Sequence, residues 1–351
     1  MPLSTGFVLG LLADNMRLRR SVLPIPTRAA TAWTRGLNLR RGGPTVLYTG
    51  QMYQLIPYIE RLVAAEQWVT GTPLARLTGL GRRVNRFVNV TAFFARPPAR
   101  ERAEYDQVPR DVARLLADAG VDFGCLYRDD LYSGALAHDL GLDEAVAVQA
   151  KRVSAVFAKH GVREVITIDP HTTHMLRSVY PTLLPGFDLQ VRNYLEVLAE
   201  RAPAVRDRLS GELAIHDSCL FARREGVLAQ PRDLLARAGM TIREPAATGR
   251  FTWCCGGPVE SLYPDKALAN ARRRVAQLRD AATSGVTMCP LCLVNLRKGA
   301  DGTMALQDIS HYLSRAYTSS ENSGSFSLPC SPSSPVAAGA GLNKPPEQET
   351  K

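Results

Sequence analysis

Five cysteines in the last third of the chain, grouped in three short motifs, constrain its fold more than any other feature. The motifs are separated by 34 and 33 residues and are, in chain order, Cys219, Cys254-Cys255-Gly256-Gly257 and Cys289-Pro290-Leu291-Cys292. Thiolates repel one another, so a fold that gathers them from three separate segments needs a soft metal centre to neutralise them. The pattern therefore predicts a metal or iron–sulfur site.

The residues alone leave three kinds of site open. Structural disulfides need an oxidising compartment, and the first apolar stretch of the chain is interrupted at Asp14 without a cleavable signal pattern. A structural zinc takes four ligands in a tetrahedron and would leave one thiolate unused. An iron–sulfur cluster can use cysteine as a terminal and as a bridging ligand. We therefore favour an iron–sulfur cluster and keep zinc as the alternative.

The order and spacing of these motifs resemble the cysteine-rich CCG domain family. That family occurs in the catalytic subunits of heterodisulfide reductases and in the iron–sulfur subunits of glycolate, lactate and glycerol-3-phosphate oxidising complexes. The resemblance extends over about residues 45–316 and implies a 4Fe–4S cluster, which is of a noncubane type in some members. The ligands that it implies are Cys219, Cys254, Cys255, Cys289 and Cys292.

Members of the family usually carry two such domains, and a degenerate earlier copy is visible in this chain. The segments around Tyr48, Ser133 and Asp169 align with those that contain Cys219, Cys255 and Cys289. The five positions that correspond to ligands are occupied by Gln51, Tyr132, Ser133, Asp169 and Thr172. The first copy therefore cannot hold the cluster of the family.

If the first copy keeps the fold, it brings a group of polar side chains together beside the cluster. We interpret them as candidates for a substrate or partner pocket. The alternatives are a metal site on the Asp-x-His-x-x-His segment and a merely structural set of hydrogen bonds. The candidates are Tyr48, Gln51, Tyr132, Asp169, His171 and His174, with Tyr53 and Ser133 beside them.

Short apolar segments alternate with amphipathic ones, which predicts an α/β fold with two Rossmann-like parallel-sheet CCG repeats. Strands are expected at residues 45–48, 121–126, 164–168, 213–216 and 286–288, and helices at 109–119, 143–160 and 264–282. Cys219 and Cys289 would then both follow strands and meet at one sheet edge. The expected divisions are an N-terminal helical extension (1–42), a degenerate CCG domain without cysteine ligands (43–205), a CCG domain with the cluster (206–316) and a disordered tail (317–351).

The formal charge of +10 favours acidic partners, but it is spread along the chain and no nucleic-acid-binding motif accompanies it. We expect no nucleic-acid partner. No segment approaches the roughly 20 apolar residues of a membrane span, so we expect no transmembrane helix, while a peripheral position of the N-terminal extension stays open. A cytoplasmic location is expected.

These features predict an iron–sulfur electron-transfer protein, or a subunit of a heterodisulfide reductase-like or FAD-linked oxidoreductase complex. The expected partner is a flavin-dependent dehydrogenase or another redox subunit, since the chain has no ferredoxin-like C-x-x-C-x-x-C segments. A thiol or disulfide, or a quinone, is a further candidate substrate at an open cluster. The alternative is a zinc-stabilised structural or assembly subunit without redox activity, and the residues assign no catalytic group.

Overall fold

The computed structural model describes residues 5–70, 85 and 96–319. The described strands form two sheets in which every pairing is parallel, and this confirms the predicted α/β fold. In spatial order, the first sheet contains β1 (Arg40–Arg41), β3 (Gly124–Cys125), β2 (Thr45–Tyr48), β4 (Glu164–Thr167) and β5 (Gln190–Asn193), and the second contains β7 (Thr241–Arg243), β6 (Glu212–His216), β8 (Ser284–Thr287) and β9 (Ala305–Asp308).

Apart from the short edge strand β1, the two sheets have the same strand order. In each sheet the second strand along the chain lies on one side of the first, and the third and fourth strands lie on the other side. The order therefore reverses between β2 and β4 in the first sheet and between β6 and β8 in the second. Ligands of open parallel sheets bind outside the carboxyl ends of the strands at such a reversal. Each half thus offers one site at an equivalent place.

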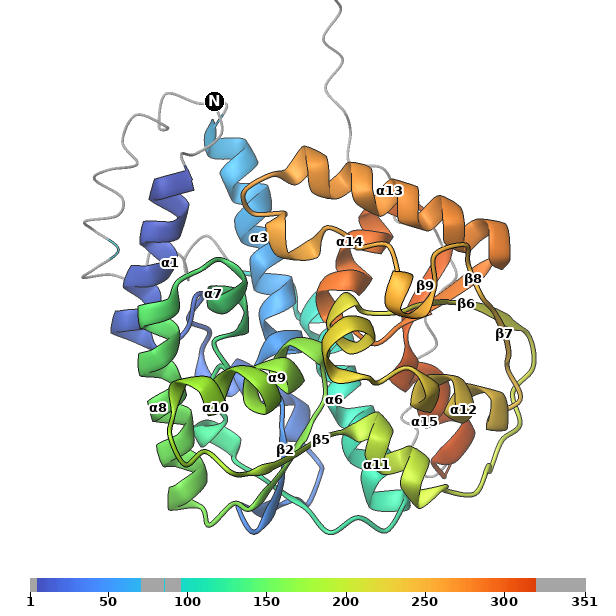
Figure 1. The fold of residues 1–351 in the computed structure, drawn as a ribbon, viewed down its shortest axis with the longest axis horizontal. Helices are drawn as coiled ribbons and strands as arrows, with labels where there is room; N and C mark the ends of the chain where they lie inside the picture. Colours follow the sequence, from blue (N-terminus) through green and yellow to red (C-terminus); the bar gives the residue numbers. More distant parts are fainter. Residues whose placement is uncertain (1–4, 71–84, 86–95, 320–351) are drawn as a thin grey trace, which may run out of the picture.

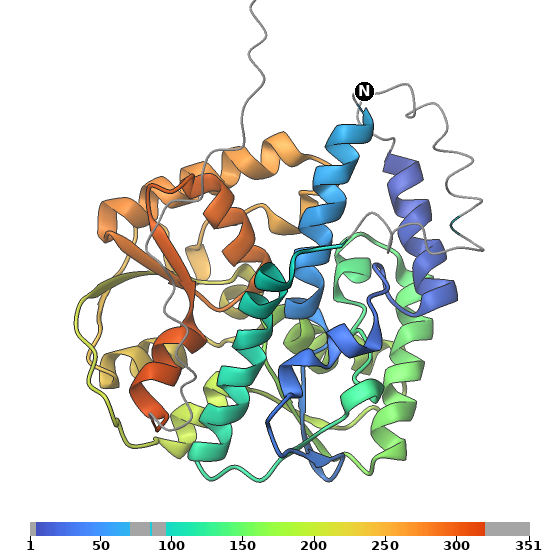
Figure 2. The same cartoon turned by 180° about the vertical axis from the view of Figure 1, so that it is seen from behind.

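Amphipathic helices cover the two sheets, and two of them run between the halves (Figure 1). α3 (Met52–Thr70) and α6 (Ala99–Asp118) pack on each other, and α6 also packs on α15 (Ile309–Tyr317) of the second half (Figure 2). The remaining helices of eight or more residues past the first strands are α8 (Asp143–Lys159), α11 (Tyr194–Arg201), α12 (Ala229–Arg237), α13 (Pro264–Ala281) and α14 (Pro290–Ala300).

The helices expected at residues 143–160 and 264–282 are confirmed by α8 and α13. The expected start of the helix at residue 109 is wrong, because α6 begins at Ala99 and Pro109 lies inside it. Proline has no N–H for the carbonyl one turn earlier, yet the helix continues because Val112, Leu115 and Leu116 are buried on its inner face. Burial of these side chains therefore stabilises the helix more than the missing backbone hydrogen bond at Pro109 destabilises it.

The N-terminal extension packs against the first half of the chain. α1 (Thr5–Arg19) lies beside α8, and the side chains of Met16, Leu23 and Trp33 are buried. Its strand β1 pairs with β3 at the edge of the first sheet. In the part of the chain that the structure describes, no helix is long and apolar enough to span a membrane. Residues 320–351, most of the expected disordered tail, lie outside the described residues.

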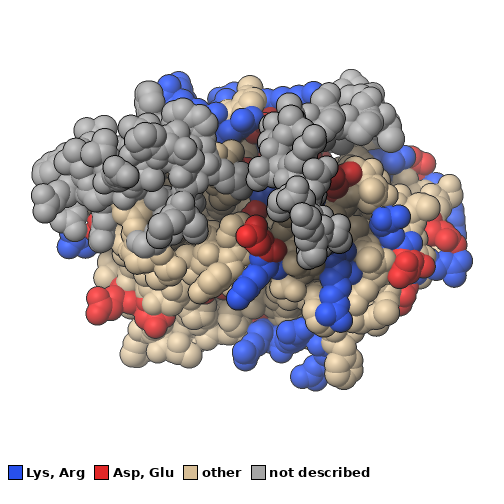
Figure 3. All heavy atoms as spheres, turned by 90° about the horizontal axis from the view of Figure 1, so that it is seen from above, with Lys and Arg blue, Asp and Glu red and all other residues tan. Residues whose placement is uncertain are grey.

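Lysine and arginine side chains are mixed with acidic ones over the surface, and several basic groups gather near the middle of the face in Figure 3. This distribution agrees with the positive formal charge of the chain. Many of the arginines are partnered: for example, Arg232 binds Asp217 and Glu244, and Arg192 binds Glu164 and Glu200.

A buried carboxyl group holds the carboxyl end of β2. Asp130 Oδ2 accepts hydrogen bonds from the backbone N–H of Thr49 at 3.3 Å and from its hydroxyl at 3.0 Å. Burial raises the pKa of Asp130 to about 7, although the bonds from Thr49 and Gly50 oppose this rise. The ionised form of Asp130 is therefore unfavourable in the folded protein.

We expect the stability of the fold to decrease as the pH rises through the pKa of Asp130. The folded pKa lies above the unfolded value of 3.8, so the stabilisation by the bound proton is present below about pH 4 and is lost as the pH rises through about 7. The difference corresponds to at most about 4 kcal/mol in the free energy of unfolding. Urea unfolding of Asp130→Asn at pH 4.5 and 7.5 should show a smaller dependence on pH than the wild type.

The control is Asp280→Asn, which removes an exposed carboxylate on α13. It should keep the pH dependence of the wild type. An Asp130→Asn variant with the same dependence as the wild type would contradict the role assigned to this buried group.

Candidate functional site

The strand order of the second sheet brings the first and third cysteine motifs together. Cys219 follows β6 and Cys289 directly precedes α14 after β8, and these two strands pair side by side with His216 opposite Thr287. Cys292 lies in the first turn of α14. All three cysteines therefore lie at the carboxyl edge where the strand order reverses.

A tight turn brings the second motif to the same edge. Gly256 has a φ of +84°, and a Cβ atom there would lie 2.9 Å from the backbone of Ala267 in α13. Only glycine combines this conformation with such a close approach. The N–H groups of Gly256 and Gly257 point to the Sγ atoms of Cys254 and Cys255 at 3.3 and 3.4 Å. The turn thus directs both thiols and supplies them with donors.

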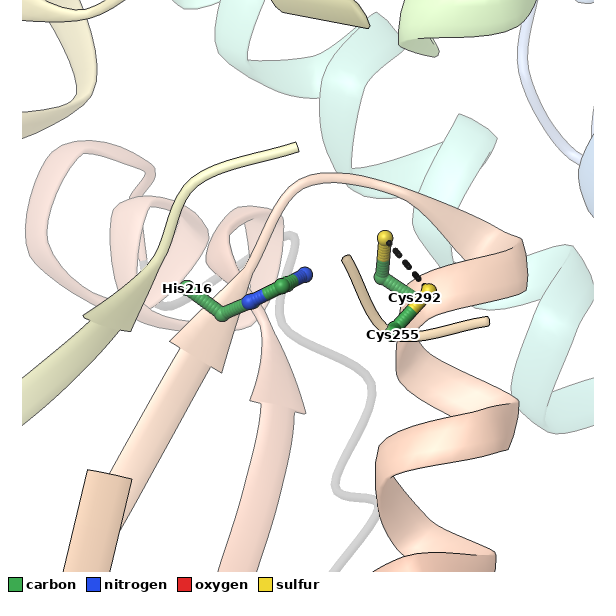
Figure 4. Close-up of side chains that lie close together, drawn as sticks. All are labelled: His216, Cys255 and Cys292. Carbon is green, nitrogen blue, oxygen red and sulfur yellow. Dashed lines mark hydrogen bonds between the residues drawn. The ribbon is translucent and has the colours of Figure 1, made fainter. Parts of the chain in front are cut away.

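The five thiols form one continuous cluster. Cys255 Sγ lies 3.3 Å from Cys292 Sγ (Figure 4). Cys254 interacts with both Cys219 and Cys255, and Cys289 interacts with Cys292. The cysteines of the described residues are all free thiols. Cys255, Cys289 and Cys292 are buried while Cys219 and Cys254 are partly exposed, so the cluster is accessible from one side.

Crowding of these groups separates their pKa values, as expected for coupled acids. The hydrogen bond with Cys254 raises the pKa of Cys219 and Cys255, and the bond with Cys255 raises the pKa of Cys292. Burial alone would raise the pKa of Cys289, but hydrogen bonds from Cys292 and His171 lower it well below its usual value. Without a cation, the five thiols cannot all ionise together. Their chemistry fits a centre that supplies positive charge.

His216 belongs to this site, although the cysteine pattern gave no reason to select it. Its ring is directed toward Cys255 and Cys292, and one atom from each of the three residues lies within 4.8 Å of the others (Figure 4). Arg274 Nε donates a hydrogen bond of 3.0 Å to His216 Nδ1. Since guanidinium nitrogens only donate, Nδ1 is the acceptor and Nε2 carries the proton. This Nε2 is buried and has no hydrogen-bond partner among the described residues.

The unpartnered Nε2–H of His216 suits a hydrogen bond to sulfur better than direct binding to a metal. Burial lowers the pKa of His216 to about 3, with a further contribution from the charge of Arg274, so the imidazole is neutral. A metal bound at Nε2 would have to displace the remaining ring proton. The group is therefore arranged to donate a hydrogen bond to a thiolate or sulfide beside it.

Two histidines of the first half contact residues of the second half. His171, in α9 (Pro170–His174), hydrogen-bonds to Cys289 through its side chain, and its Nδ1 lies 3.0 Å from Asp139 Oδ2. Burial would lower the pKa of His171, but Asp139 and Cys289 raise it well above its usual value. His174 Nδ1 lies 2.6 Å from Oε1 of Glu225, which ends the helical turn after Cys219.

The other candidate pocket residues of the first half form hydrogen bonds with their own backbone surroundings. Tyr48 donates to the carbonyl of Leu131, Gln51 donates to the carbonyl of Asp130, and the Tyr132 hydroxyl accepts from two backbone N–H groups. Asp169 accepts from the N–H groups that begin α9 at 2.9 Å each. Gln51 and Tyr132 also line a small cavity of about 140 Å³ that includes residues of the N-terminal extension.

The Gly256 turn can be tested by adding a single methyl group. Gly256→Ala should lower the free energy of unfolding by about 1 to 3 kcal/mol, because it adds backbone strain to a collision with the Ala267 backbone. Gly302→Ala is the matched control: its φ is +76° and its added Cβ would meet nothing within 4 Å. Equal losses in the two variants, measured by urea unfolding, would contradict the importance of close packing at Gly256.

Comparisons with known proteins identify the segment that carries the thiols. Residues 213–297 match the cysteine-rich domain family called CCG. The chain is also 30% identical over 217 residues to a protein of Syntrophomonas wolfei named EtfAB:quinone oxidoreductase, covering 58% of this chain and 30% of the relative. A Bacillus subtilis protein named "Probable iron-sulfur-binding oxidoreductase FadF" is 29% identical over 209 residues, covering 57% and 29%.

A third relative, from Methanothermobacter marburgensis, is named as one of the subunits of a fumarate reductase (CoM/CoB). It is 26% identical over 170 residues, which cover 46% of this chain and 34% of the relative. This chain therefore spans about a third of the length of the curated relatives it matches. The match of residues 213–297 to this family model confirms the predicted resemblance of the second half to the CCG family.

Proposed function

We propose that this chain is an iron–sulfur electron-transfer subunit of a heterodisulfide reductase-like or FAD-linked oxidoreductase complex. Its ligands to a 4Fe–4S cluster would be Cys219, Cys254, Cys255, Cys289 and Cys292. The observation that carries the proposal is the continuous cluster of five free thiols at one sheet edge. The names of the relatives in Syntrophomonas and Bacillus, which refer to an oxidoreductase and to iron–sulfur binding, support it.

When bound, such a cluster supplies the capacity to accept and release single electrons. The residues of the chain would set how readily this happens. The N–H groups of Gly256 and Gly257 and the His216 Nε2–H stabilise negative charge on sulfur, and burial of Cys255 excludes water from the inner side. The partly exposed side at Cys219 and Cys254 leaves access for a partner or a small acceptor.

The partner in this proposal is a flavin-dependent dehydrogenase or another redox subunit. The names of two relatives mention a quinone oxidoreductase and a fumarate reductase with several subunits, which supports a role inside a redox complex. A thiol or disulfide, or a quinone, is the proposed class of acceptor if the open side binds substrate directly. A cytoplasmic location belongs to the same proposal.

Zinc is less well supported as the occupant. A tetrahedral zinc could take Cys255, Cys292 and His216 with one more thiolate, but the Arg274 hydrogen bond keeps the proton on the His216 atom that faces the cysteines. Four cysteines would bind zinc without His216, and then one of the five buried or half-buried thiols would have no role. The five-thiol set fits an iron–sulfur cluster better.

The first test is the metal content of protein purified without oxygen. We expect about four irons per chain with a similar amount of acid-labile sulfide, and a paramagnetic resonance signal of a cluster in one redox state. Cys255→Ala should lose most of the iron, because it removes a central thiol that contacts two others. Cys125→Ala is the matched control: Cys125 is also a buried free cysteine, but it lies in β3 of the first sheet. Stoichiometric zinc without sulfide, or equal iron in both variants, would overturn the proposal.

The second test concerns the hydrogen bond assigned to His216. Replacing it with leucine should leave the iron content near that of the wild type and lower the midpoint potential by on the order of 50 mV, the equivalent of about 1 kcal/mol for one hydrogen bond and one electron. The potential is measured by redox titration followed by paramagnetic resonance. His216→Gln, which keeps a donor, should recover part of the shift.

Two results would contradict this role. An unchanged potential in His216→Leu would mean that the Nε2–H does not act on the sulfur atoms. A changed number of irons per chain in a folded variant would instead make His216 a ligand.

A further inference from the structure

A second cavity lies between the two halves of the molecule, and none of the five clustered cysteines lines it. It has a volume of about 540 Å³, which is within the usual range of small-molecule sites. Its walls come from α3 and α6 of the first half, from α14 and α15 of the second half, and from the segment around the short helix α2 (Thr27–Ala30). The long helices of these walls lie along the middle of the molecule seen from behind (Figure 2).

Three arginines line the cavity without a salt bridge or a side-chain hydrogen bond to any described residue: Arg28, Arg35 and Arg102. The Nε atom of Arg102 is buried and lacks a hydrogen-bond partner in the described part of the chain. By contrast, Arg297 in the same wall pairs with Glu104 at 2.5 Å. Arg28 and Arg35 are exposed, whereas Arg102 is half-buried. A guanidinium N–H that is shielded from water without an acceptor is unfavourable, so the buried donor of Arg102 is well suited to a bound oxyanion.

Two of the acidic groups in the walls have hydrogen-bond partners other than these arginines. Asp111 accepts from Gln107 at 2.7 Å, and Asp308 accepts from the hydroxyl of Tyr53 at 2.5 Å. Burial raises the pKa of Asp111 to about 6. It also raises the pKa of Asp106 to about 6, although Arg102, Arg110 and Arg35 act in the opposite direction. No side-chain hydrogen bond joins Asp106 to these arginines in the described structure.

Apolar groups line another part of the cavity. They include Pro57 and Tyr58 of α3, Ala99 and Ala103 of α6, and Leu293 of α14. A simple inorganic anion would leave this surface unused. The combination of unpaired guanidinium groups with an apolar wall favours an organic ligand that has an anionic end.

We propose that this cavity binds a small organic molecule that carries a carboxylate or phosphate group, with Arg102 and Arg35 holding the anionic group and Tyr58 and Leu293 packing against the apolar part. Leu293 lies one turn along α14 from Cys289, and Asp308 in the wall bonds to Tyr53 of α3. The ligand would therefore bind next to the thiol cluster but on separate residues. Binding does not require the cluster.

Calorimetric titration of the full chain with phenyl phosphate and with benzoate tests this proposal and distinguishes a phosphate from a carboxylate ligand. We expect one of them to bind to one site, and phenol, which lacks the charge, not to bind. Arg102→Gln should weaken binding about tenfold or more, as expected for the loss of a charged hydrogen bond. Arg114→Gln is the matched control, since Arg114 lies on the same helix but outside the cavity, and it should bind as the wild type does.

A second variant tests the cavity itself. Ala103 is exposed at the cavity wall, so Ala103→Phe should place a ring in the cavity and reduce binding without disturbing the core. Binding should persist in Cys255→Ala, which separates this site from the proposed cluster. No binding of either probe at millimolar concentration, or equal affinity in Arg102→Gln and Arg114→Gln, would overturn the site. Inorganic phosphate binding as tightly as phenyl phosphate would overturn the organic ligand.

Discussion

The main constraint on the second half is that five thiols, which repel one another when they ionise, share one sheet edge. Proteins rarely bring so many acids of the same charge together, because each ionised group makes the next ionisation harder. Here the sheet order places Cys219 and Cys289 side by side, and the Gly256 turn adds Cys254 and Cys255. Backbone N–H donors and the His216 ring face the sulfur atoms. The polypeptide thus supplies part of the compensation, and a bound cationic centre would supply the rest.

The two halves use the same backbone geometry with different side chains. Gly134 and Gly256 occupy corresponding turns with φ values of +86° and +84°. Asp169 and Cys289 each precede a proline at the start of a helix. In the first half, the Asp169 carboxylate accepts the N–H groups at this helix start, whereas in the second half the N–H of Cys292 bonds to the Cys289 sulfur. The replacement of cysteine by aspartate therefore preserves the helix start without a metal ligand.

Much of the site could be predicted because it depends on short, local patterns. The strands before Cys219 and Cys289 are apolar, and the parallel arrangement implies that their carboxyl ends meet. β7 and β9 were not expected, since Thr241–Arg243 and Ala305–Asp308 contain few apolar residues and owe their conformation to pairing with neighbours. No local sequence pattern predicted a role for His216 either. Its importance comes from the position of Arg274, 58 residues later, which determines the ring nitrogen that carries the proton.

The contacts across the centre explain why a half without cysteine ligands remains useful to the site. His171 bonds to Cys289, His174 bonds to Glu225 just after the Cys219 segment, and Tyr53 bonds to Asp308 beside α14. The first contact is with a thiol itself, the second is with the segment that follows Cys219, and the third is with the end of β9, which packs on α14. Buried polar contacts of this kind require matched geometry on both sides, because a lost partner leaves a buried group unpaired. The first half therefore forms a wall opposite the thiol cluster. This wall keeps the inner side of the cluster buried and holds the cysteines in position.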